Sequence, residues 1–257
     1  MKKLFAILLV FVTLFVLAAC GEKPVEETPS EDIFAKSEGT MTYAEYAAVE
    51  ANKDITVTIE AFIQARQTWW EQDSIGKSSF YLMDKDGGYF CYRLHCTQEE
   101  YNKLTVGTKV KITGKKAVYQ GLNEFGEDAT FEIMKGTWIC PNPVELSFDE
   151  YNNNALKYQN QLFLVKNAEV VASEDAEGAE VAFLYNWNGS GEKGDDIYIK
   201  VKLGDVVQTI VIESTLCDKD SEVYKAAEAL KVGDKINFEG FLYWYKGAQP
   251  HVTKITK

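Results

Sequence analysis

Few side chains in this sequence belong to the types that perform acid–base, nucleophilic or metal chemistry. The chain has two histidines, His95 and His251, and five cysteines. Cys91, His95 and Cys96 lie close together, but their spacing does not fit a zinc finger or a zinc ribbon. We therefore expect no catalytic residue, no metal site and no cofactor, and we predict that the protein is not an enzyme.

Two glycine-containing segments match chemical motifs in letters only. Residues 189–194 fit the dinucleotide pattern Gly-x-Gly-x-x-Gly, but that pattern needs a following helix to hold a pyrophosphate. Here the acidic pair Asp195 and Asp196 leads into a strand-like run, which favours a loop. Residues 84–87, Asp-Lys-Asp-Gly, match the start of a calcium loop but lack its final glutamate, which favours a tight hairpin turn.

The N-terminus carries the clearest chemical signal. Lys2 and Lys3 precede an uncharged apolar run over residues 4–16, which is shorter than the roughly 20 residues of a membrane-spanning helix. The run ends in Leu-Ala-Ala-Cys at residues 17–20, which resembles the bacterial lipobox. We predict a signal peptide over residues 1–19 and a Cys20 thiol that receives diacylglycerol and a second acyl chain such as palmitate. The protein would then be extracytoplasmic and anchored by lipid to a bacterial membrane.

The segment after Cys20 is predicted to be an acidic, flexible stalk over residues 20–40. Five glutamates, one aspartate and two prolines dominate it, and Ile33 and Phe34 are its only adjacent bulky apolar residues. Such a composition buries too little apolar surface to offset the entropy of ordering. The remaining cysteines, Cys91, Cys96, Cys140 and Cys217, allow either disulfides or small buried thiols, and the sequence does not choose between them.

Size and charge limit the classes of partner. Removing residues 1–19 removes two lysines and no acid, so 25 basic and 39 acidic side chains give the mature chain a net charge of −14. An acidic surface repels polyanions, and tight nonspecific binding to nucleic acid normally depends on basic residues. The charge therefore disfavours a nucleic-acid partner unless one face is locally basic.

The body of the chain repeats itself. Residues 104–114 match residues 230–240 with five identities in eleven positions, and Tyr119 and Gly121 align with Tyr245 and Gly247. Upstream, residues 41–46 parallel residues 146–151, and both segments contain a Thr/Ser-x-x-Glu capping box that closes the first turn of a helix. We predict a duplicated domain, with boundaries at 41–143 and 144–257.

Each repeat has the pattern of a small barrel. In the first, alternating residues predict strands over 55–62, 79–83 and 89–94, a helix over 98–104, and strands over 109–119 and 130–134. The second repeats this order over 162–171, 197–203, 206–213, 221–230, 235–245 and 252–255, with a longer loop after its first strand. A helix between the third and fourth strands is typical of the OB-fold. We predict an all-β protein with short helices, built as two tandem five-stranded OB-fold Greek-key barrels.

The repeated motif also resembles a known group of domains. Leu-x-Val-Gly-x-Lys-Val-x-Ile-x-Gly at residues 104–114, preceded by Ser-Phe-Tyr-Leu-Met-Asp at 79–84, resembles OB-type domains of exported bacterial nucleases and of uncharacterised lipoproteins. The resemblance covers about residues 41–257 as two copies. In the nucleases such a domain accompanies a separate catalytic domain, and this sequence contains none.

Aromatic residues are the candidates for ligand binding. OB-folds usually bind ligands on the face of strands 2 and 3, between the loops that join strands 1–2 and strands 4–5. Flat rings at these places can stack on bases or on sugars, or they can simply close the barrels and pack between them. If one ring of the Trp69–Trp70 pair tucks into the barrel, we expect the other to be exposed. The candidates are Trp69, Trp70, Tyr119, Tyr185, Trp187, Trp244, Tyr245 and His251.

Taken together, these patterns predict a membrane-anchored, noncatalytic OB-fold binding module. Single-stranded nucleic acid and oligosaccharide are the candidate ligands, the first by fold analogy alone. The alternatives are a structural or protein-interaction lipoprotein of the cell envelope and an enzyme of an unrecognised type. The exposure of the tryptophans separates the binding role from the structural role.

Overall fold

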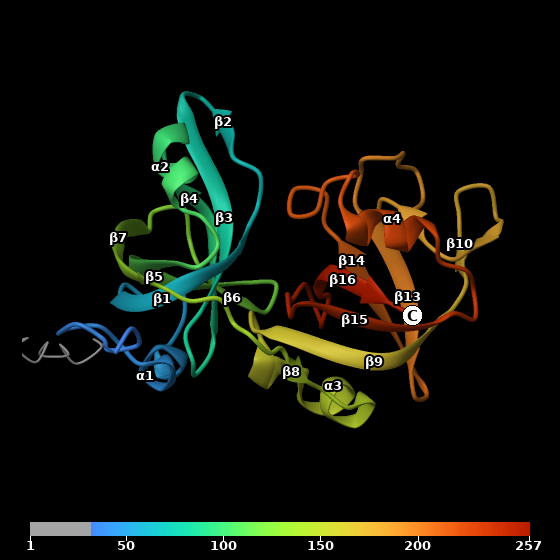
Figure 1. The fold of residues 1–257 in the computed structure, drawn as a ribbon, viewed down its shortest axis with the longest axis horizontal. Coiled ribbons are helices and arrows are strands. Elements are labelled where there is room, and N and C mark those ends of the chain that lie inside the picture. The colour runs from blue at the N-terminus through green and yellow to red at the C-terminus, as the bar shows by residue number, and fades with distance from the viewer. Residues whose placement is uncertain (1–31) are drawn as a thin grey trace, which may run out of the picture. The chain divides into compact units, whose positions relative to one another are not determined.

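The computed structural model describes residues 32–257 of the chain. Residues 33–257 form one compact unit, in which two β-barrels follow one another along the chain (Figure 1). The predicted signal peptide, Cys20 and most of the predicted stalk lie outside the described residues. Among the described residues, no helix is long and apolar enough to span a bilayer.

The end of the predicted stalk packs against the first barrel. The Phe34 ring centroid lies 5.5 Å from that of Phe62 and 5.2 Å from that of Trp138, both in edge-on contact. Lys36 Nζ lies 2.7 Å from an Asp84 carboxylate oxygen. The aromatic contact explains the difference from the expected stalk, because Phe34 finds a ready apolar surface on the barrel. Residues 34–36 of the predicted stalk therefore contact the first barrel.

The first sheet contains a closed ring of five strands. Its pairing order is β1–β3–β4–β6–β5 and back to β1, and β4 and β6 are parallel. Helix α2 (Gln98–Lys103) lies between the third and fourth strands of the ring. This is the OB-fold order, and it confirms the predicted fold class. The strands are β1 (Thr56–Arg66), β2 (Trp70–Gln72), β3 (Ile75–Met83), β4 (Gly88–His95), β5 (Thr108–Tyr119), β6 (Leu122–Phe125) and β7 (Thr130–Thr137).

One predicted strand has a different place in this ring. The sequence pattern assigned residues 130–134 as the fifth barrel strand, but that segment belongs to β7, which pairs only with β5 outside the ring. The closing strand is β6, which follows β5 after the two-residue turn Gln120-Gly121. Both turn residues have positive φ angles, 50° and 94°, as a tight hairpin requires. The four-residue strand was missed because it is short and contains Asn123 and Glu124.

The second sheet has the same ring. Its order is β9–β13–β14–β16–β15 and back to β9, with β14 and β16 parallel and helix α4 (Glu222–Glu228) before β15. Gly107 and Gly233 precede the fourth strand of their rings with φ angles of 92° and 89°, which confirms their predicted equivalence. The strands are β8 (Val144–Glu145), β9 (Leu162–Val170), β10 (Ser173–Glu174), β11 (Glu180–Val181), β12 (Leu184–Tyr185), β13 (Ile197–Leu203), β14 (Val206–Ile212), β15 (Lys235–Phe241) and β16 (His251–Thr256).

Short capped helices lead into both barrels. Helix α1 (Tyr43–Ala48) has the predicted capping box, with both hydrogen bonds between Thr42 and Glu45 present. Helix α3 (Phe148–Asn154), which continues into the 3₁₀ helix η1 (Ala155–Tyr158), has the half in which Ser147 accepts from the backbone N–H of Glu150. Each cap satisfies donors that the first helical turn leaves open.

A third apolar cluster joins the barrels. Tyr81, Met83, Phe90 and Leu122 of the first barrel pack with Phe241 of the second, and the rings of Tyr81 and Phe241 stack 4.4 Å apart. Cys140 and several aromatic side chains surround this cluster. The four cysteines of the described residues are free thiols, and Cys91 and Cys96 are buried. The barrels are therefore held by packing, and their shared surface contains the site described next.

Candidate ligand-binding cleft

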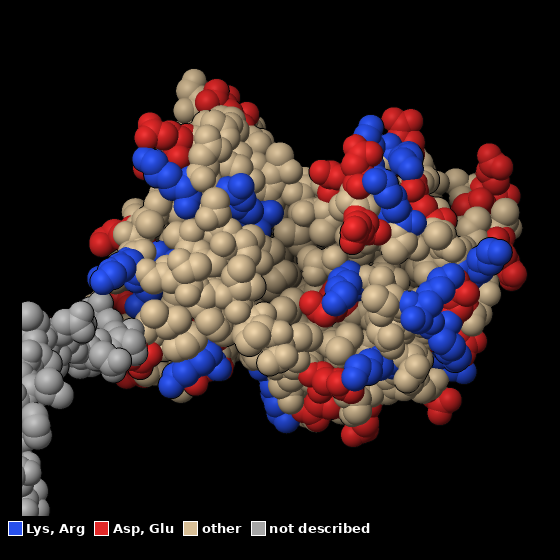
Figure 2. All heavy atoms as spheres, in the orientation of Figure 1, with Lys and Arg blue, Asp and Glu red and all other residues tan. Residues whose placement is uncertain are grey.

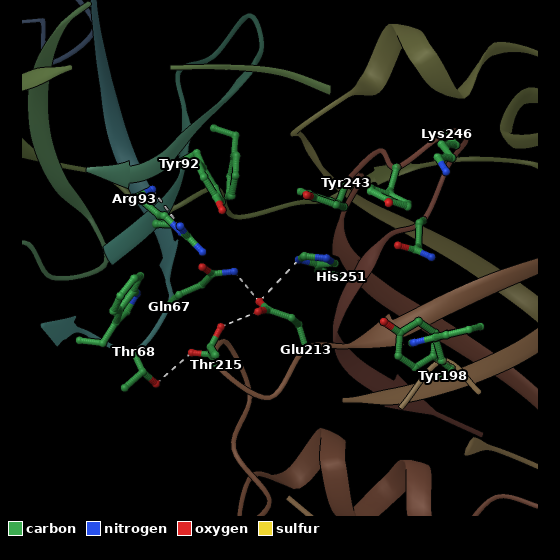
Figure 3. A pocket seen from close by; sticks show the side chains of 16 residues that line it. Gln67, Thr68, Tyr92, Arg93, Tyr198, Glu213, Thr215, Tyr243, Lys246 and His251 are labelled. Atoms are coloured by element: carbon green, nitrogen blue, oxygen red, sulfur yellow. Dashed lines mark hydrogen bonds and ion pairs between the residues drawn. The ribbon is translucent and has the colours of Figure 1, made fainter. Parts of the chain in front are cut away.

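A cleft of about 1040 Å³ opens between the two barrels (Figure 3). Both walls are rich in aromatic rings, and hydroxyl and amide side chains lie between the rings. Arg93 and Lys246 are the cations among its lining residues, and Glu213 is the carboxylate. The lining consists of Gln67, Thr68, Trp70, Ser79, Phe90, Tyr92 and Arg93 from the first barrel, and Trp187, Tyr198, Glu213, Thr215, Tyr243, Tyr245, Lys246, Gln249 and His251 from the second.

The first wall is shaped by a β-bulge in β4. Ser78 pairs with Leu94 and Phe80 pairs with Cys91, so the single residue Ser79 faces two residues of β4. The second of these, Arg93, has a φ angle of 51°, and its N–H donates to Ser79 Oγ at 3.2 Å. Neighbouring residues of a regular strand point to opposite faces. The bulge lets both Tyr92 and Arg93 line the cleft.

Arg93 lies beside two aromatic rings of this wall. Its guanidinium carbon is 4.8 Å from the ring centroid of Tyr92 and 5.1 Å from that of Trp70. Lys77 Nζ approaches the same Trp70 ring at 4.6 Å. Cations attract the electron-rich faces of rings, so these contacts hold Trp70 at the rim of the cleft. Trp70 is the first residue of β2. This strand follows the loop after β1 and forms a hairpin with β3.

The second wall comes from a strand and two loops of the second barrel. Tyr198 projects from β13, and Trp187 stands in the long loop after β9 with 70% of its surface exposed. Tyr243 and Tyr245 belong to the loop between β15 and β16. In OB-fold terms, these are the strand 2 face, the loop between strands 1 and 2, and the loop between strands 4 and 5. The faces at which OB-folds usually bind ligands therefore share one cleft in this protein.

The floor of the cleft is a hydrogen-bonded network that crosses between barrels. Glu213 accepts hydrogen bonds from Gln67 Nε2 and Thr215 Oγ1, both at 2.5 Å (Figure 3). Tyr81 Oη lies 2.9 Å from His251 Nδ1. Burial raises the pKa of Glu213 and lowers that of His251 to about 3. His251 is therefore neutral at pH 7, and its ring stacks on Tyr243 at 4.1 Å.

Four of the eight predicted candidates line the cleft, namely Trp70, Trp187, Tyr245 and His251. Trp69 and Trp70 separate as expected for adjacent residues. Trp69 packs on the core of the first barrel and donates its indole N–H to Cys96 O at 2.9 Å, whereas Trp70 reaches the cleft. One ring therefore tucks inward as expected, but Trp70 is half-buried and not exposed.

The other three candidates lie elsewhere. Tyr185 donates its hydroxyl to Glu228 and stacks near Tyr224 of helix α4. Trp244 packs against the apolar cluster that joins the barrels, close to Gly121. Tyr119 is 54% exposed, and its ring lies 6.4 Å from that of Tyr245, beside the cleft but outside its lining. Arg66 Nη1 donates to the carbonyls of Tyr101 and Leu104 at the end of helix α2.

Several cleft residues were not identified from the sequence. These are Phe90, Tyr92, Tyr198 and Tyr243, which line the cleft but were not among the predicted candidates. The signal was available for Tyr198, because it alternates with the buried Ile197 and Ile199 on a predicted strand 2. For Tyr92 there was no such signal, since the bulge that turns it outward is set by tertiary pairing.

Charge is unevenly spread over the face seen in Figure 2. Lysine, arginine and acidic side chains crowd the half that contains the second barrel, whereas much of the surface over the first barrel is uncharged (Figure 2). The whole chain has a formal charge of −12. Within the part of the chain that the structure describes, no group of three or more His, Cys, Asp or Glu side chains is placed to hold a metal ion.

No protein-family model matches the chain. The chain is similar to Endonuclease YhcR of Bacillus subtilis (strain 168), with 33% identity over 120 residues. The matched region is 46% of this chain but only 9% of that protein. The chain therefore spans a small fraction of its relative.

Solved structures with related folds include DNA-binding proteins. The Ifi202 HINa domain in complex with 20-bp double-stranded DNA matches with a TM-score of 0.37 and 10% identity, over 78% of this chain and 97% of that one. A deletion mutant of the single-stranded DNA binding protein from Thermus aquaticus matches with a TM-score of 0.25 and 10% identity, over 79% and 93%. Similarity at this level carries no argument about a ligand.

Proposed function

We propose that this protein is a noncatalytic binding module that holds a single-stranded nucleic acid in the cleft between its two barrels. The observation that carries the proposal is the convergence of rings from both barrels on one open cleft, at the faces that OB-folds use for ligands. Trp70 and Tyr92 approach from one side, and Trp187, Tyr198 and Tyr245 from the other. A chain of bases presents one flat face after another, as several rings in one cleft require.

Stacking supplies most of the binding energy in this proposal. Each ring that meets a base contributes about 1–3 kcal/mol. The cleft has two lining cations, Arg93 and Lys246, so few counterions leave a bound phosphate backbone. We therefore expect a shallow dependence of affinity on salt, unlike that of a basic groove. The acidic surface elsewhere would keep duplexes and other polyanions from binding nonspecifically.

The relative's name is consistent with this ligand class. The name Endonuclease YhcR indicates an enzyme that acts on nucleic acid, and the region shared with this chain is a small part of that protein. A module of this kind would hold the substrate while a separate domain performs the chemistry. We propose that this chain retains the binding role alone.

An oligosaccharide is the second candidate, and the neutral polar groups of the cleft favour it. Gln67, Thr68, Ser79 and Gln249 lie between the rings and offer amide and hydroxyl groups. Stacked rings with such neighbours also suit the apolar faces and hydroxyls of sugars. Because sugars are uncharged, this candidate requires neither of the cleft cations.

Tryptophan fluorescence of residues 33–257 distinguishes these candidates. The protein would be titrated with a 12-mer of oligothymidine, with a neutral glucose or N-acetylglucosamine oligomer, and with duplex DNA. We expect saturable binding of the oligonucleotide that weakens by at least tenfold in the Trp70→Ala, Trp187→Ala variant, as the loss of two rings implies. The matched control is Trp244→Ala, which removes a ring outside the cleft lining.

The outcomes are distinct. Saturation by the neutral oligosaccharide alone would favour the second candidate. No response to any polymer would favour the structural or protein-interaction role. Packing of Trp69 and Trp244 against the cores fits that role, but the 70% exposure of Trp187 does not, because a ring that only supports the fold would be covered.

We also propose that the protein is extracytoplasmic and tethered to a bacterial membrane through lipid on Cys20. This part of the proposal depends on the sequence pattern of residues 1–20. A tether would keep a bound polymer near the cell surface. Its test is given among the predictions below.

A further inference from the structure

Three basic side chains meet one carboxylate at the outer end of the first wall. Lys77 Nζ lies 3.4 Å, Arg93 Nη1 3.5 Å and His95 Nε2 3.7 Å from a carboxylate oxygen of Glu127. Glu127 belongs to the connection between β6 and β7, whereas the basic residues stand on β3 and β4. Strand pairing and a loop thus bring together residues that are far apart in the sequence.

This group, which we call the basic corner, is only partly neutralised. Ion pairs elsewhere on the surface range from 2.6 Å between Lys235 and Glu169 to 3.9 Å between Lys157 and Glu150, so the corner differs from them by its excess of cations and not by its distances. In the basic corner one carboxylate is shared by Lys77 and Arg93, with His95 at its side. The corner therefore keeps a net positive charge even with Glu127 in place, within a chain of formal charge −12.

The same cations cover the face of Trp70. Lys77 Nζ and the Arg93 guanidinium carbon lie 4.6 and 5.1 Å from its ring centroid. A base cannot stack on a covered face of Trp70 until the cation over that face moves aside. A phosphate beside the ring would draw Lys77 and Arg93 away from it. An anion that accepts hydrogen bonds from both cations attracts them more strongly than an aromatic ring does.

We infer that Lys77, Arg93 and His95 form a subsite for a backbone phosphate, and that the Glu127 carboxylate occupies this subsite when no ligand is bound. The inference rests on the proposed nucleic-acid function and adds the position of the ligand. One phosphate is fixed at the basic corner, and the neighbouring base stacks on Trp70. The φ angle of 51° at Arg93 is part of this arrangement. The bulge directs the Arg93 side chain toward the Trp70 ring and the Glu127 carboxylate.

The test is the affinity of Glu127→Gln for the 12-mer of oligothymidine in residues 33–257. Removing the competing charge should tighten binding about fivefold, the size of a partly exposed ion pair. Glu132→Gln is the matched control, since it makes the same charge change at an exposed position on β7 of the same barrel. We expect less than a twofold effect there. Arg93→Gln and Lys77→Gln should each weaken binding and reduce the salt dependence.

A second variant and a second probe keep the inference testable if Glu127→Gln folds poorly. Glu127→Asp retains the charge but withdraws it by one methylene, and we expect a smaller gain in affinity. A methylphosphonate 12-mer, whose backbone is uncharged, should bind wild type and Glu127→Gln equally. A gain for that neutral backbone equal to the gain for the phosphodiester would overturn the phosphate subsite.

Two other results separate the inference from the function beneath it. If wild type binds the oligonucleotide and Glu127→Gln binds it no better than Glu132→Gln does, the subsite is overturned and the proposed function stands. If neither protein binds oligonucleotide at any salt concentration, the proposed function fails and the subsite fails with it. A gain seen only with a sulfated polysaccharide would also overturn the assignment to phosphate.

Discussion

The Tyr81 hydroxyl lies 2.9 Å from Nδ1 of His251, and the two residues belong to different barrels. Both side chains are buried, and the Tyr81 ring also stacks on Phe241 of the second barrel. This contact connects the apolar joint between the barrels with the polar floor of the cleft. The geometry of the cleft therefore depends on a joint made by single side chains.

Tyr81→Phe should weaken that joint without changing its packing. The ring stays in place, but the His251 nitrogen loses its buried partner, at a cost of about 1–2 kcal/mol. Urea unfolding of residues 33–257 measures this loss. Tyr158→Phe is the control, because it removes a less buried hydroxyl that donates to Glu150. Equal stability of the two variants would show that the Tyr81 hydrogen bond contributes nothing beyond a surface contact.

Gly88→Ala should disturb the joint through backbone contact. A Cβ at Gly88 would lie 2.4 Å from the backbone of Asn160, which lies just before strand β9 of the second barrel. Overpacking of this kind costs about 1–3 kcal/mol and would force the barrels apart at this point. Gly247→Ala is the matched control, since nothing lies within 4 Å of the added atom. Thermal unfolding should show a lower midpoint for the first variant only, and similar midpoints would argue against a close joint at Gly88.

Glu124 should make stability depend on pH. Its side chain is buried on β6, and desolvation raises its pKa from 4.5 to about 7. The folded state thus favours the protonated form, so this contribution is fully present below about pH 4.5 and is lost as the pH rises through 7. Glu124→Gln, which stays neutral, should be more stable than wild type at pH 8 by about 1–2 kcal/mol.

The control for this pH prediction is Glu132→Gln, at an exposed position on β7. We expect it to follow the wild-type profile of unfolding free energy between pH 5 and pH 8. A Glu124→Gln profile parallel to wild type over that range would mean that the Glu124 carboxyl is solvated and charged in the folded protein.

Membrane attachment should depend on one thiol. Cys20→Ser replaces the thiolate nucleophile with a hydroxyl, which is too weak a nucleophile to accept diacylglycerol. Labelling of growing cells with a fatty-acid analogue should mark the full-length chain but not this variant. Cys140→Ser, which removes a partly exposed cysteine of the folded body, should keep the label. Equal labelling of wild type and Cys20→Ser would eliminate the proposed anchor.

Local patterns in the sequence were enough to predict most of the fold. The apolar patterns of β1, β3 and β4 and the repeated segment around Gly107 and Gly233 predicted four of the five strands of the first ring and all five of the second. This worked because burial on one face of a strand fixes a period of two, and a glycine with positive φ marks the same turn in each copy. The helix caps at Thr42 and Ser147 are equally local, since each is completed within three residues.

The cleft was decided by tertiary structure. Trp69 and Trp70 have the same chemistry and adjacent positions, and only the packing of β2 on β3 sends one to the core and the other to the cleft. Tyr92 and Arg93 share a wall because a bulge forms where β4 pairs with β3. The basic corner and the Tyr81–His251 contact join residues 50 and 170 positions apart, for Lys77 with Glu127 and Tyr81 with His251. Periodicity specifies which face of a strand is covered, but it contains no information about which distant surface covers it.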